Sequence, residues 1–384
     1  MNYRYPIFLA SNAIFSLLLT SCSKQEIPIN AHAAQDEPIR ISVIDILIKK
    51  MMSDRQIPGL SLGVVKEGKT ILQRAYGLAD VEARTPAKVE TIYPLASVSK
   101  IFTSVAVMRV VESGGLSLDD KIVRLLPGLP SVWGEITVRH LLSHTSGLPD
   151  VVVRDDPMEF LGETRQEALR KVAAIPLQSR PGETYRYIQT GYMLLGMILE
   201  QHSGKKFPAV MQEQLFGPLS MTSTRYGDAR RDINGQASHY TMLRPDRDGK
   251  WMRLGRPEPI AVYWPDYEYP GAGLNSTVGD LARWEAALEP GRLLKLSSLE
   301  TMWTATEESR VAQGRAFGTG CGWLIGEEAG HKWVGQVGGD SAAFLRFPDD
   351  HLTVIVLDNC RGSDVLSIAL GVSKCIISGT DKNK

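Results

Sequence analysis

Ser97 and Lys100 have the types and the spacing that serine-based catalysis requires. A serine three residues before a lysine, followed by a long apolar run, places both side chains on one face of a helix. A serine hydroxyl is a weak nucleophile that needs a neighbouring base, and a partly buried lysine can supply one because burial lowers its pKa. The N–H groups at the start of the helix favour negative charge that develops near the serine. The pattern therefore predicts a serine nucleophile that a lysine activates.

The same Ser-x-x-Lys spacing occurs at two further places in the chain. Residues 21–24 lie at the end of a leader, and residues 203–206 follow a helix at a glycine, where lysines favour the helix C-terminus. Ser97 alone precedes a strong helical pattern, at residues 101–112. The alternative for Ser97 is a serine that caps a helix and is followed by a solvated lysine.

The elements that must position this pair predict an α+β fold. A helix is expected at 41–52, followed by a hairpin of strands at 59–65 and 70–77. Residues 101–217 indicate an all-helical lobe inserted into the sheet. The C-terminal part predicts further strands and a final helix, at 320–325, 332–338, 344–347, 353–357 and 365–377. The fold class is therefore an antiparallel sheet flanked by helices.

Two segments between the lobe and the last strands are expected to lie near the site. Residues 244–269 have no clear period and predict a loop, in which Trp251 and Trp264 either line a substrate mouth or anchor the loop. Residues 271–277 lead into a helix that Thr277 caps.

The composition describes an ordinary globular protein. The 384 residues are 43% hydrophobic and 22% charged, and the formal net charge is zero. The charge balance gives no reason to expect a nucleic-acid partner. The sequence contains no zinc-type spacing of cysteine and histidine, no P-loop and no dinucleotide fingerprint.

Cys22 follows a short apolar segment that is typical of a signal peptide rather than of a membrane span. The segment 19–22 resembles a bacterial lipobox, which implies a lipidated Cys22 and a protein anchored in the bacterial cell envelope. Ser23 follows instead of aspartate, which implies the outer membrane, facing the periplasm. The alternative is an ordinary signal peptide with an incidental cysteine. The predicted organisation is a signal peptide at 1–21, a flexible tether at 22–39, one domain at 40–378 and a polar tail at 379–384.

Three cysteines remain, and they allow at most one disulfide. An exported protein can form such a bridge. Small buried thiols are at least as consistent with the sequence. These residues are Cys321, Cys360 and Cys375.

Several motifs together resemble one family, the serine β-lactamase-like group of class C β-lactamases, D-alanyl-D-alanine peptidases and related esterases. The resemblance covers about residues 40–378. The motifs that carry it lie at 97–100, 141–149, 191–196, 273–277 and 320–323. It implies the β-lactamase/transpeptidase-like fold and an acyl-enzyme on Ser97. It implies no metal and no cofactor.

The second motif of this family is tyrosine followed two residues later by asparagine, and here the matching positions are Tyr187 and Gln189. The resemblance implies that Tyr187 relays a proton between the serine, the lysine and the leaving group. Gln189 keeps an amide, one methylene longer, for binding in the site. The alternative is that Tyr185 and Tyr187 are packing aromatics before a helix.

The third family motif places a lysine or histidine two residues before a glycine, and here Gln336 replaces the cation. Gly338 fits the close approach of a strand to a ligand, because it has no Cβ. By resemblance, the N–H groups of Gly339 and Ser97 form an oxyanion hole. His331 cannot replace the cation, because it lies five residues before Gln336 and faces the other side of a straight strand.

His144 is expected to be a buried structural histidine. A Ser-His pair with Ser146 is the alternative, but the Gly-x-Ser-x-Gly nucleophile elbow is absent, because position 144 is histidine rather than glycine.

Two functional hypotheses follow from the sequence. The first is an exported serine hydrolase that forms an acyl-enzyme on Ser97 and hydrolyses an ester or amide, whether a β-lactam, a peptide or a carboxylic ester. By resemblance, the cation that Gln336 replaces helps bind a substrate carboxylate, so the neutral Gln336 disfavours substrates that carry one, because a charge-assisted bond is about twice as strong as a neutral one. The second is a binding or regulatory protein that keeps the pocket and has lost turnover. The departures at Gln189 and Gln336 together favour this second hypothesis.

Overall fold

The computed structural model describes residues 37–155, 158–227, 233–246, 251–312 and 317–377 of the chain. The expected signal peptide, Cys22 and the polar tail lie outside the described residues. The first described helix, α2 (Glu37–Arg55), begins within the range predicted as a tether. Among the helices described, none combines the length and the apolar character that crossing a membrane requires.

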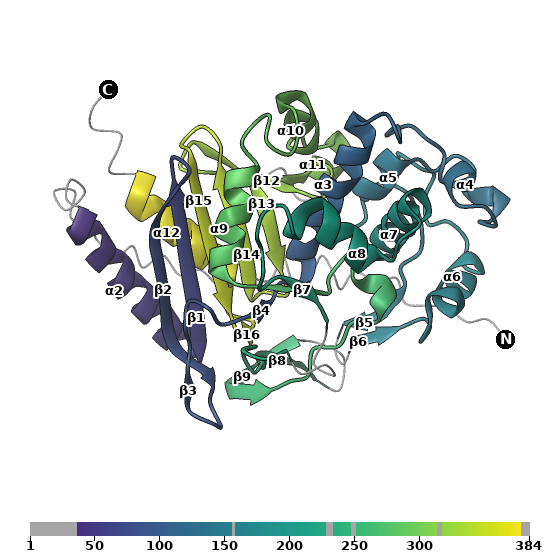
Figure 1. Cartoon of the computed structure of the whole chain (residues 1–384). Coiled ribbons are helices and arrows are strands. Elements are labelled where there is room, and N and C mark those ends of the chain that lie inside the picture. Colours follow the sequence, from purple (N-terminus) through teal and green to yellow (C-terminus); the bar gives the residue numbers. More distant parts are fainter. Residues whose placement is uncertain (1–36, 156–157, 228–232, 247–250, 313–316, 378–384) are drawn as a thin grey trace.

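An eight-stranded sheet, antiparallel throughout, forms the centre of the molecule (Figure 1). Across the sheet the strands are β11 (Phe317–Thr319), β12 (Leu324–Glu328), β13 (His331–Gly338), β14 (Ala342–Phe347), β15 (Leu352–Asp358), β1 (Gly59–Lys66), β2 (Lys69–Asp80) and β3 (Thr85–Pro86). β15 is rich in β-branched residues and buried along its whole length, as a central strand requires. β1 pairs with β15, so the N-terminal hairpin completes a sheet that the C-terminal strands build. The predicted α+β class is confirmed.

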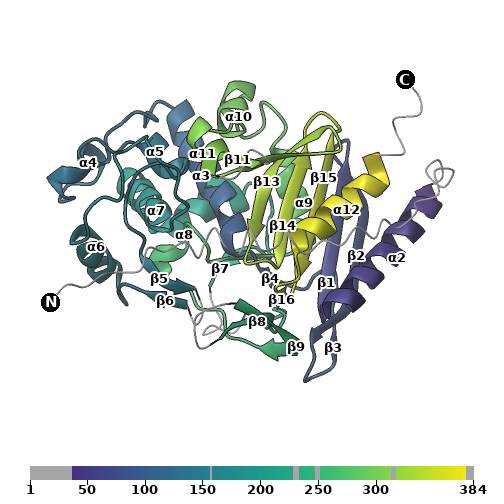
Figure 2. The same ribbon diagram turned by 180° about the vertical axis from the view of Figure 1, so that it is seen from behind.

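Helices cover both faces of this sheet. On one face α2 packs beside α12 (Val365–Ile377), as Figure 2 shows. On the other face lie α3 (Ser99–Glu112) and α9 (Val278–Ala287), whose N-terminus is capped by the hydroxyl of Thr277 as predicted. α3 is buried nearly all round, which is the property of a helix enclosed by other elements. It lies between the sheet and the lobe and carries Lys100 in its first turn.

The lobe beyond α3 is predominantly helical (Figure 1). Its helices are α4 (Ile122–Leu125), α5 (Val138–Leu142), α6 (Arg165–Ala173), α7 (Thr190–Ser203) and α8 (Phe207–Met211), with the 3₁₀ turn η3 (Ser131–Trp133) and the π-helical turn η4 (Gln212–Phe216). The expectation of an all-helical lobe is wrong in one place, where β5 (Val152–Asp155) and β6 (Met158–Phe160) form a hairpin. Strands this short do not show a period of two clearly in the sequence.

The segment 244–269, predicted as a loop, is a second correction. Residues 244–245 and 251–259 belong to the hairpin of β8 (Tyr240–Pro245) and β9 (Trp251–Pro259), which joins β16 (Cys360–Arg361) in a small sheet, whereas residues 260–265 form the expected loop. Prolines in β9 obscured the strand pattern in the sequence. A proline has no backbone N–H to donate, and this is tolerated because β9 lies at the edge of the sheet. The segment ends in the 3₁₀ turn η5 (Asp266–Glu268).

Three short strands connect this region to the site, and two short helices follow. The strands are β4 (Tyr93–Pro94), β10 (Leu274–Ser276) and β7 (Arg225–Tyr226), in the order β4-β10-β7. The helices are α10 (Leu296–Met302) and α11 (Glu307–Ala312). The strand predicted at 320–325 begins only at Leu324, because Gly322 adopts a left-handed turn conformation with φ of +81°.

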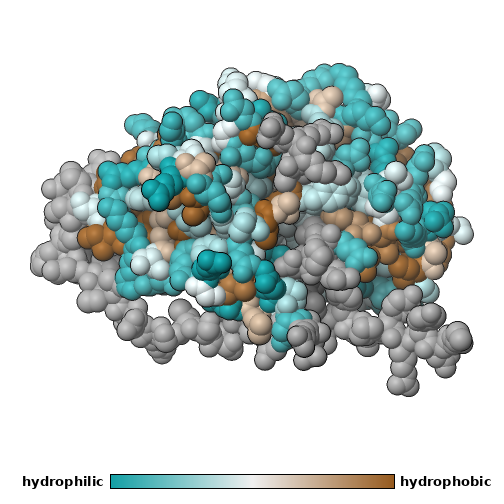
Figure 3. All heavy atoms as spheres, turned by 90° about the horizontal axis from the view of Figure 1, so that it is seen from below, coloured by the Kyte–Doolittle hydropathy of each residue, from teal (hydrophilic) through white to brown (hydrophobic). Residues whose placement is uncertain are grey.

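The described surface is mixed in polarity. Figure 3 views the molecule from below, where polar residues in teal are interspersed with smaller apolar areas in brown. Exposed large apolar side chains lie on separate elements, for example Ile46 on α2 and Met252 on β9. Apolar residues scattered in this way are ordinary for a folded protein.

Candidate active site

Ser97 lies in the 3₁₀ turn η2 (Ala96–Val98), which runs directly into α3. Its side chain is partly exposed, whereas Lys100 is completely buried. The ammonium nitrogen of Lys100 is 3.4 Å from the hydroxyl oxygen of Ser97. The structure therefore brings the predicted pair together, with the serine open to a substrate and the lysine behind it.

Two neutral oxygens hold the Lys100 side chain in place. Lys100 Nζ donates to Gln189 Oε1 at 2.8 Å and to the carbonyl of Gly271 at 2.9 Å. Burial lowers the pKa of Lys100 to about 7, although the nearby acids Glu268 and Asp150 act in the opposite direction. Neutral lysine, the form that can accept a proton, is therefore well populated near pH 7.

Polar residues along α3 fix the segment that supplies the Gly271 carbonyl. The hydroxyl of Ser99 accepts from the N–H of Leu274 at 3.1 Å, and the hydroxyl of Thr103 donates to the carbonyl of Pro270 at 2.7 Å. Lys100 bonds to Gly271 between these two attachments. The residues 270–274 are thus fastened along the helix that carries the lysine.

Gly271 also makes room for the longer amide at position 189. A Cβ on residue 271 would lie 2.5 Å from Gln189 Oε1, which is closer than real Cβ contacts allow. The missing side chain at 271 therefore accommodates the extra methylene of glutamine. Gln189 consequently reaches the lysine despite its departure from the family motif.

Tyr187 lies on the other side of the lysine. Its ring centroid is 4.8 Å from Lys100 Nζ, and its hydroxyl is hydrogen-bonded with Ser97. Burial raises the pKa of Tyr187 well above its ordinary value, which the Ser97 hydrogen bond only partly offsets. Tyr187 therefore stays protonated at neutral pH. It can donate its hydroxyl proton to another group only if it also accepts a proton.

His144 supports Tyr187, and the expectation of a buried structural histidine is confirmed. Its ring packs on that of Tyr187, with centroids 4.4 Å apart, and Nδ1 accepts from the N–H of Ile188 at 3.3 Å. Burial and the positive charge of Lys100 hold the pKa of His144 well below its usual range, so the ring is neutral. Its backbone has φ of +59°, which is uncommon for a residue with a side chain.

Asp150 fastens the next part of the same segment. Its Oδ1 accepts from the N–H of Gln189 at 2.9 Å and from the N–H of Val152 at 3.3 Å. Burial raises the pKa of this acid to about 6, and these hydrogen bonds act against the rise. The loop 144–150 thereby sets the backbone from which Tyr187 and Gln189 project.

Gly338 and Gly339 close the site from the end of β13. A Cβ on Gly338 would lie 2.0 Å from the carbonyl oxygen of Leu95 and 2.9 Å from the backbone nitrogen of Ser97. Only glycine allows so close an approach between this strand and the turn that carries the serine. Gly339 is exposed, with φ of +57°. This arrangement places the two glycines beside the serine, where the expected oxyanion hole would be.

Gln336 faces the same side of the sheet, but its amide is bound within the protein. Its side chain is 2% exposed, its Nε2 donates to the carbonyl of Gly322 at 3.0 Å, and its Oε1 accepts from the N–H of Val337 at 3.0 Å. His331 begins the same strand and bonds to Asp350 at 3.0 Å. Neither residue brings a positive charge to the serine.

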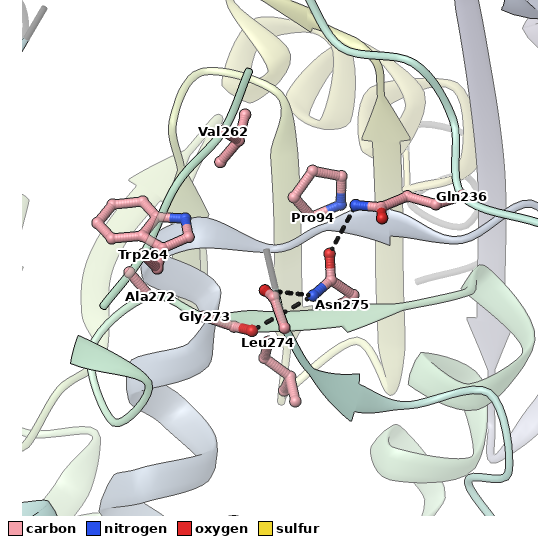
Figure 4. Close-up of a pocket in the computed structure, with 9 residues that line it drawn as sticks. Pro94, Gln236, Val262, Trp264, Ala272, Gly273, Leu274 and Asn275 are labelled. Carbon is pink, nitrogen blue, oxygen red and sulfur yellow. Dashed lines mark hydrogen bonds between the residues drawn. The ribbon is translucent and has the colours of Figure 1, made fainter. Parts of the chain in front are cut away.

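A small, partly open pocket lies beside the site, next to β4 and β10 (Figure 4). Trp264 and Gln236 line it, and Asn275 fixes its wall by accepting from Gln236 and donating to the carbonyls of Gly227 and Gly273. Of the two tryptophans predicted to line a mouth or anchor a loop, Trp264 faces this pocket.

Trp251 lies apart from this pocket, on β9. The guanidinium of Arg361 is 4.6 Å from its ring centroid, a cation–π contact on the small sheet.

The three described cysteines are free, and each is buried. The expectation of buried thiols is confirmed, and a disulfide between any two of them is not formed. These residues are Cys321, Cys360 and Cys375.

A family model described as Beta-lactamase matches residues 44–370. The chain belongs to the beta-lactamase family. The chain is 25% identical over 328 residues to Protein flp of Staphylococcus aureus (strain MRSA252), covering 84% of this chain and 63% of that protein. It is 28% identical over 324 residues to Penicillin-binding protein 4* of Bacillus subtilis (strain 168), covering 76% and 66%. It thus spans less than two thirds of the length of these two relatives.

Two solved structures of similar proteins share the fold of this chain. The octameric penicillin-binding protein homologue from Pyrococcus abyssi has a TM-score of 0.71 and 27% identity, covering 88% of this chain and 77% of that one. EstCE1, a hydrolase with promiscuous acyltransferase activity, has a TM-score of 0.73 and 24% identity, covering 88% and 99%. The predicted membership of the serine hydrolase family is confirmed.

Sequence reasoning missed two buried acids that face the lysine. Asp150 follows the motif at 141–149, and Glu268 lies in the segment that the sequence predicted as a loop. Glu268 stands between two aromatic residues and just before Pro270 and Gly271. An acid in so apolar a setting was the available signal, because charged residues are rarely buried without a role.

Proposed function

We propose that this protein is a serine hydrolase that forms an acyl-enzyme on Ser97 and acts on esters or amides without a carboxylate next to the scissile bond. The observation that carries the proposal is the buried Lys100, whose Nζ lies 3.4 Å from the serine hydroxyl and whose pKa burial lowers to about 7. The retained bond from Gln189 to Lys100 favours turnover over a pocket that only binds.

The proposed reaction starts with proton transfer from Ser97 to Lys100. As the serine oxygen bonds to the substrate carbonyl, Lys100 Nζ accepts the hydroxyl proton and becomes an ammonium. The N–H groups of Ser97 and Gly339 stabilise the carbonyl oxygen, which becomes negative. Tyr187 then gives its proton to the leaving group and takes one from Lys100. Water hydrolyses the acyl-enzyme by the same route in reverse.

The proposed substrate class follows from the charges around the serine. Gln336 supplies no positive charge, and its amide is already bonded to Gly322 and Val337. A substrate carboxylate at this place would lose its water without gaining a charged partner, which is costly. Neutral carboxylic esters and amides avoid that cost, so we place them ahead of β-lactams and D-alanyl-D-alanine peptides.

We also propose that the protein is exported and anchored through a lipid on Cys22, in the outer membrane facing the periplasm. The support is the lipobox-like sequence at 19–22. Metabolic labelling with an alkyne fatty acid should mark the full chain in its host and fail to mark Cys22→Ala. Equal labelling of both chains would contradict the anchor.

A pair of matched substrates tests the substrate class. Hydrolysis of phenyl butyrate should be faster than hydrolysis of 3-carboxyphenyl butyrate, which has the same acyl group but carries a carboxylate on the leaving group. Ser97→Ala should abolish both rates. A preference for the charged ester would contradict the role given to Gln336. The absence of any acylation in the folded protein would favour the binding protein.

A further inference from the structure

The turn between β13 and β14, residues 338–341, carries the Gly339 N–H group that the proposed reaction assigns to the oxyanion hole. Gly339 and Asp340 both have positive φ, +57° and +59°, as the central residues of a type I′ turn do. The N–H of Ser341 closes the turn by donating to the carbonyl of Gly338 at 3.0 Å. A left-handed conformation is costly for a residue with a side chain, so the surrounding structure must hold Asp340 in it.

A buried segment outside the turn holds it at two successive carbonyls. The hydroxyl of Ser363, in the loop before α12, donates to the carbonyl of Asp340. The N–H of Asp358, the last residue of β15, donates to the carbonyl of Ser341 at 2.8 Å. The two holding residues also contact each other, because the hydroxyl oxygen of Ser363 lies 2.7 Å from Asp358 Oδ2. Both are 0% exposed, so the contact is shielded from water.

The hold on the turn reaches the Gly339 N–H through two planar peptide groups. The carbonyl of Asp340, which Ser363 holds, belongs to the same peptide group as the N–H of Ser341. That N–H bonds to the carbonyl of Gly338, which shares a peptide group with the Gly339 N–H. Because a peptide group is rigid, fixing one side of it fixes the direction of the other. The direction of the Gly339 N–H is thus coupled to the Ser363 hydroxyl.

The Ser363 hydroxyl has one hydrogen and two oxygens within reach, so it cannot donate to Asp340 and to Asp358 at once. Both contacts are hydrogen bonds when Asp358 is protonated on Oδ2, because the acid then donates to Ser363. Its other oxygen, Oδ1, accepts from the N–H of Cys360 at 2.8 Å. Burial raises the pKa of Asp358 well above its ordinary value, although the bonds with Cys360 and Ser363 act against the rise. The charges of Asp340 and Arg55 act on this pKa in opposite directions.

We propose that Ser363 and a protonated Asp358 are positioning residues that hold the turn 338–341, so that the Gly339 N–H faces the reacting carbonyl oxygen. This inference rests on the proposed function, in which that N–H stabilises the oxyanion. Both side chains are fully buried, so they act through the turn rather than by touching the substrate. A donor that is already held in place needs no reorganisation when the negative charge develops, and its position therefore affects the rate.

Ser363→Ala tests the inference, because it removes the hydroxyl that holds the Asp340 carbonyl. We expect kcat and kcat/KM for phenyl butyrate to fall together by about 10-fold or more, since loss of a whole oxyanion donor costs about 10²–10³. Ser373→Ala is the matched control, because it removes another fully buried hydroxyl, which donates to the carbonyl of Leu370 at 2.8 Å within α12. It should lower the melting temperature to a similar extent and leave both constants unchanged. Equal constants in folded Ser363→Ala and the parent protein would overturn the inference.

Two substitutions of Asp358 test the proton and carry the test if Ser363→Ala fails to fold. In Asp358→Asn the amide can donate to Ser363 as the protonated acid does, whereas in Asp358→Leu the side chain has a similar shape and no donor. We expect Asp358→Asn to keep most of the rate and Asp358→Leu to lose about as much as Ser363→Ala. Equal slowing in both variants of Asp358, or a parent rate in Asp358→Leu, would overturn the inference.

Hydrogen exchange examines the turn without a substrate, so the two proposals can fail separately. Mass spectrometry of a peptide that covers residues 338–341 should show faster exchange in Ser363→Ala, because the closing Ser341 N–H is less protected, and parent exchange in Ser373→Ala. Faster exchange without any acylation of Ser97 would keep the hold on the turn and remove the hydrolase. Acylation of Ser97 with unchanged exchange and unchanged rate in Ser363→Ala would keep the hydrolase and remove the positioning role.

Discussion

Gly271→Ala should slow acylation of Ser97 without unfolding the protein. The new Cβ would lie 2.5 Å from Gln189 Oε1, while its next contact, with Tyr192 Cβ, is at 3.4 Å. The end of a flexible side chain must therefore move, and the backbone need not. The movement breaks the 2.8 Å bond between Gln189 and Lys100.

The size of the effect follows from the kind of bond that is lost. Lys100 becomes an ammonium during acylation, and a hydrogen bond to a charged group contributes ~1.5–3 kcal/mol, which corresponds to a rate about 10- to 150-fold slower. The assay is the second-order rate of fluorophosphonate labelling, with the melting temperature measured beside it. Gly255→Ala is the matched control, because a Cβ at this β9 glycine meets nothing within 4 Å.

Gln189→Asn provides the sharper test of the same fit. Alone it should also slow labelling, because the shorter amide no longer reaches Lys100. In the Gly271→Ala background it should slow labelling little further, because the bond between residue 189 and Lys100 is already lost there. Residues in direct contact show such non-additive coupling. Two single effects that simply add in the double variant, or a Gly271→Ala protein that labels at the parent rate, would refute the reasoning.

Three further expectations concern the site and its surroundings. Labelling should rise about tenfold per pH unit below the Lys100 pKa of about 7 and level off above it, because the base must be neutral; a flat profile between pH 5 and 8 would contradict this. Gly338→Ala should cost ~1–3 kcal/mol of stability, seen as a lower melting temperature, because its Cβ would lie 2.0 Å from a backbone carbonyl. The described thiols should react with a thiol reagent only after unfolding, because they are buried and burial raises the pKa of Cys321 to about 11 and of Cys360 to about 12.

Much of the sheet could be predicted because its strands carry clear signals. The segment 353–357 is continuously apolar and β-branched, and it became the centre of the sheet. The final helix was predicted at 365–377, the bounds it has in the structure. The hairpin of β8 and β9 was missed because prolines and charges on an edge strand give no alternating pattern. The β5–β6 hairpin was too short to show one.

The site residues that belong to sequence motifs could be predicted, and the residues that join them through packing could not. Ser97, Lys100 and Gln189 stand at recognisable spacings, and the structure brings them together. The fit between Gln189 and Gly271 joins residues far apart in sequence, so no local pattern reveals it. The burial of Glu268 is a property of tertiary packing, so no local pattern reveals it either.

The most direct test of the account is the identity of the residue that becomes acylated. The domain is incubated with a fluorophosphonate probe, its intact mass is measured, and the modified peptide is mapped in the parent protein and in Ser97→Ala. The account predicts one adduct, on Ser97, that is absent from Ser97→Ala. A folded parent protein that remains unmodified, or an adduct that persists in Ser97→Ala, would contradict it.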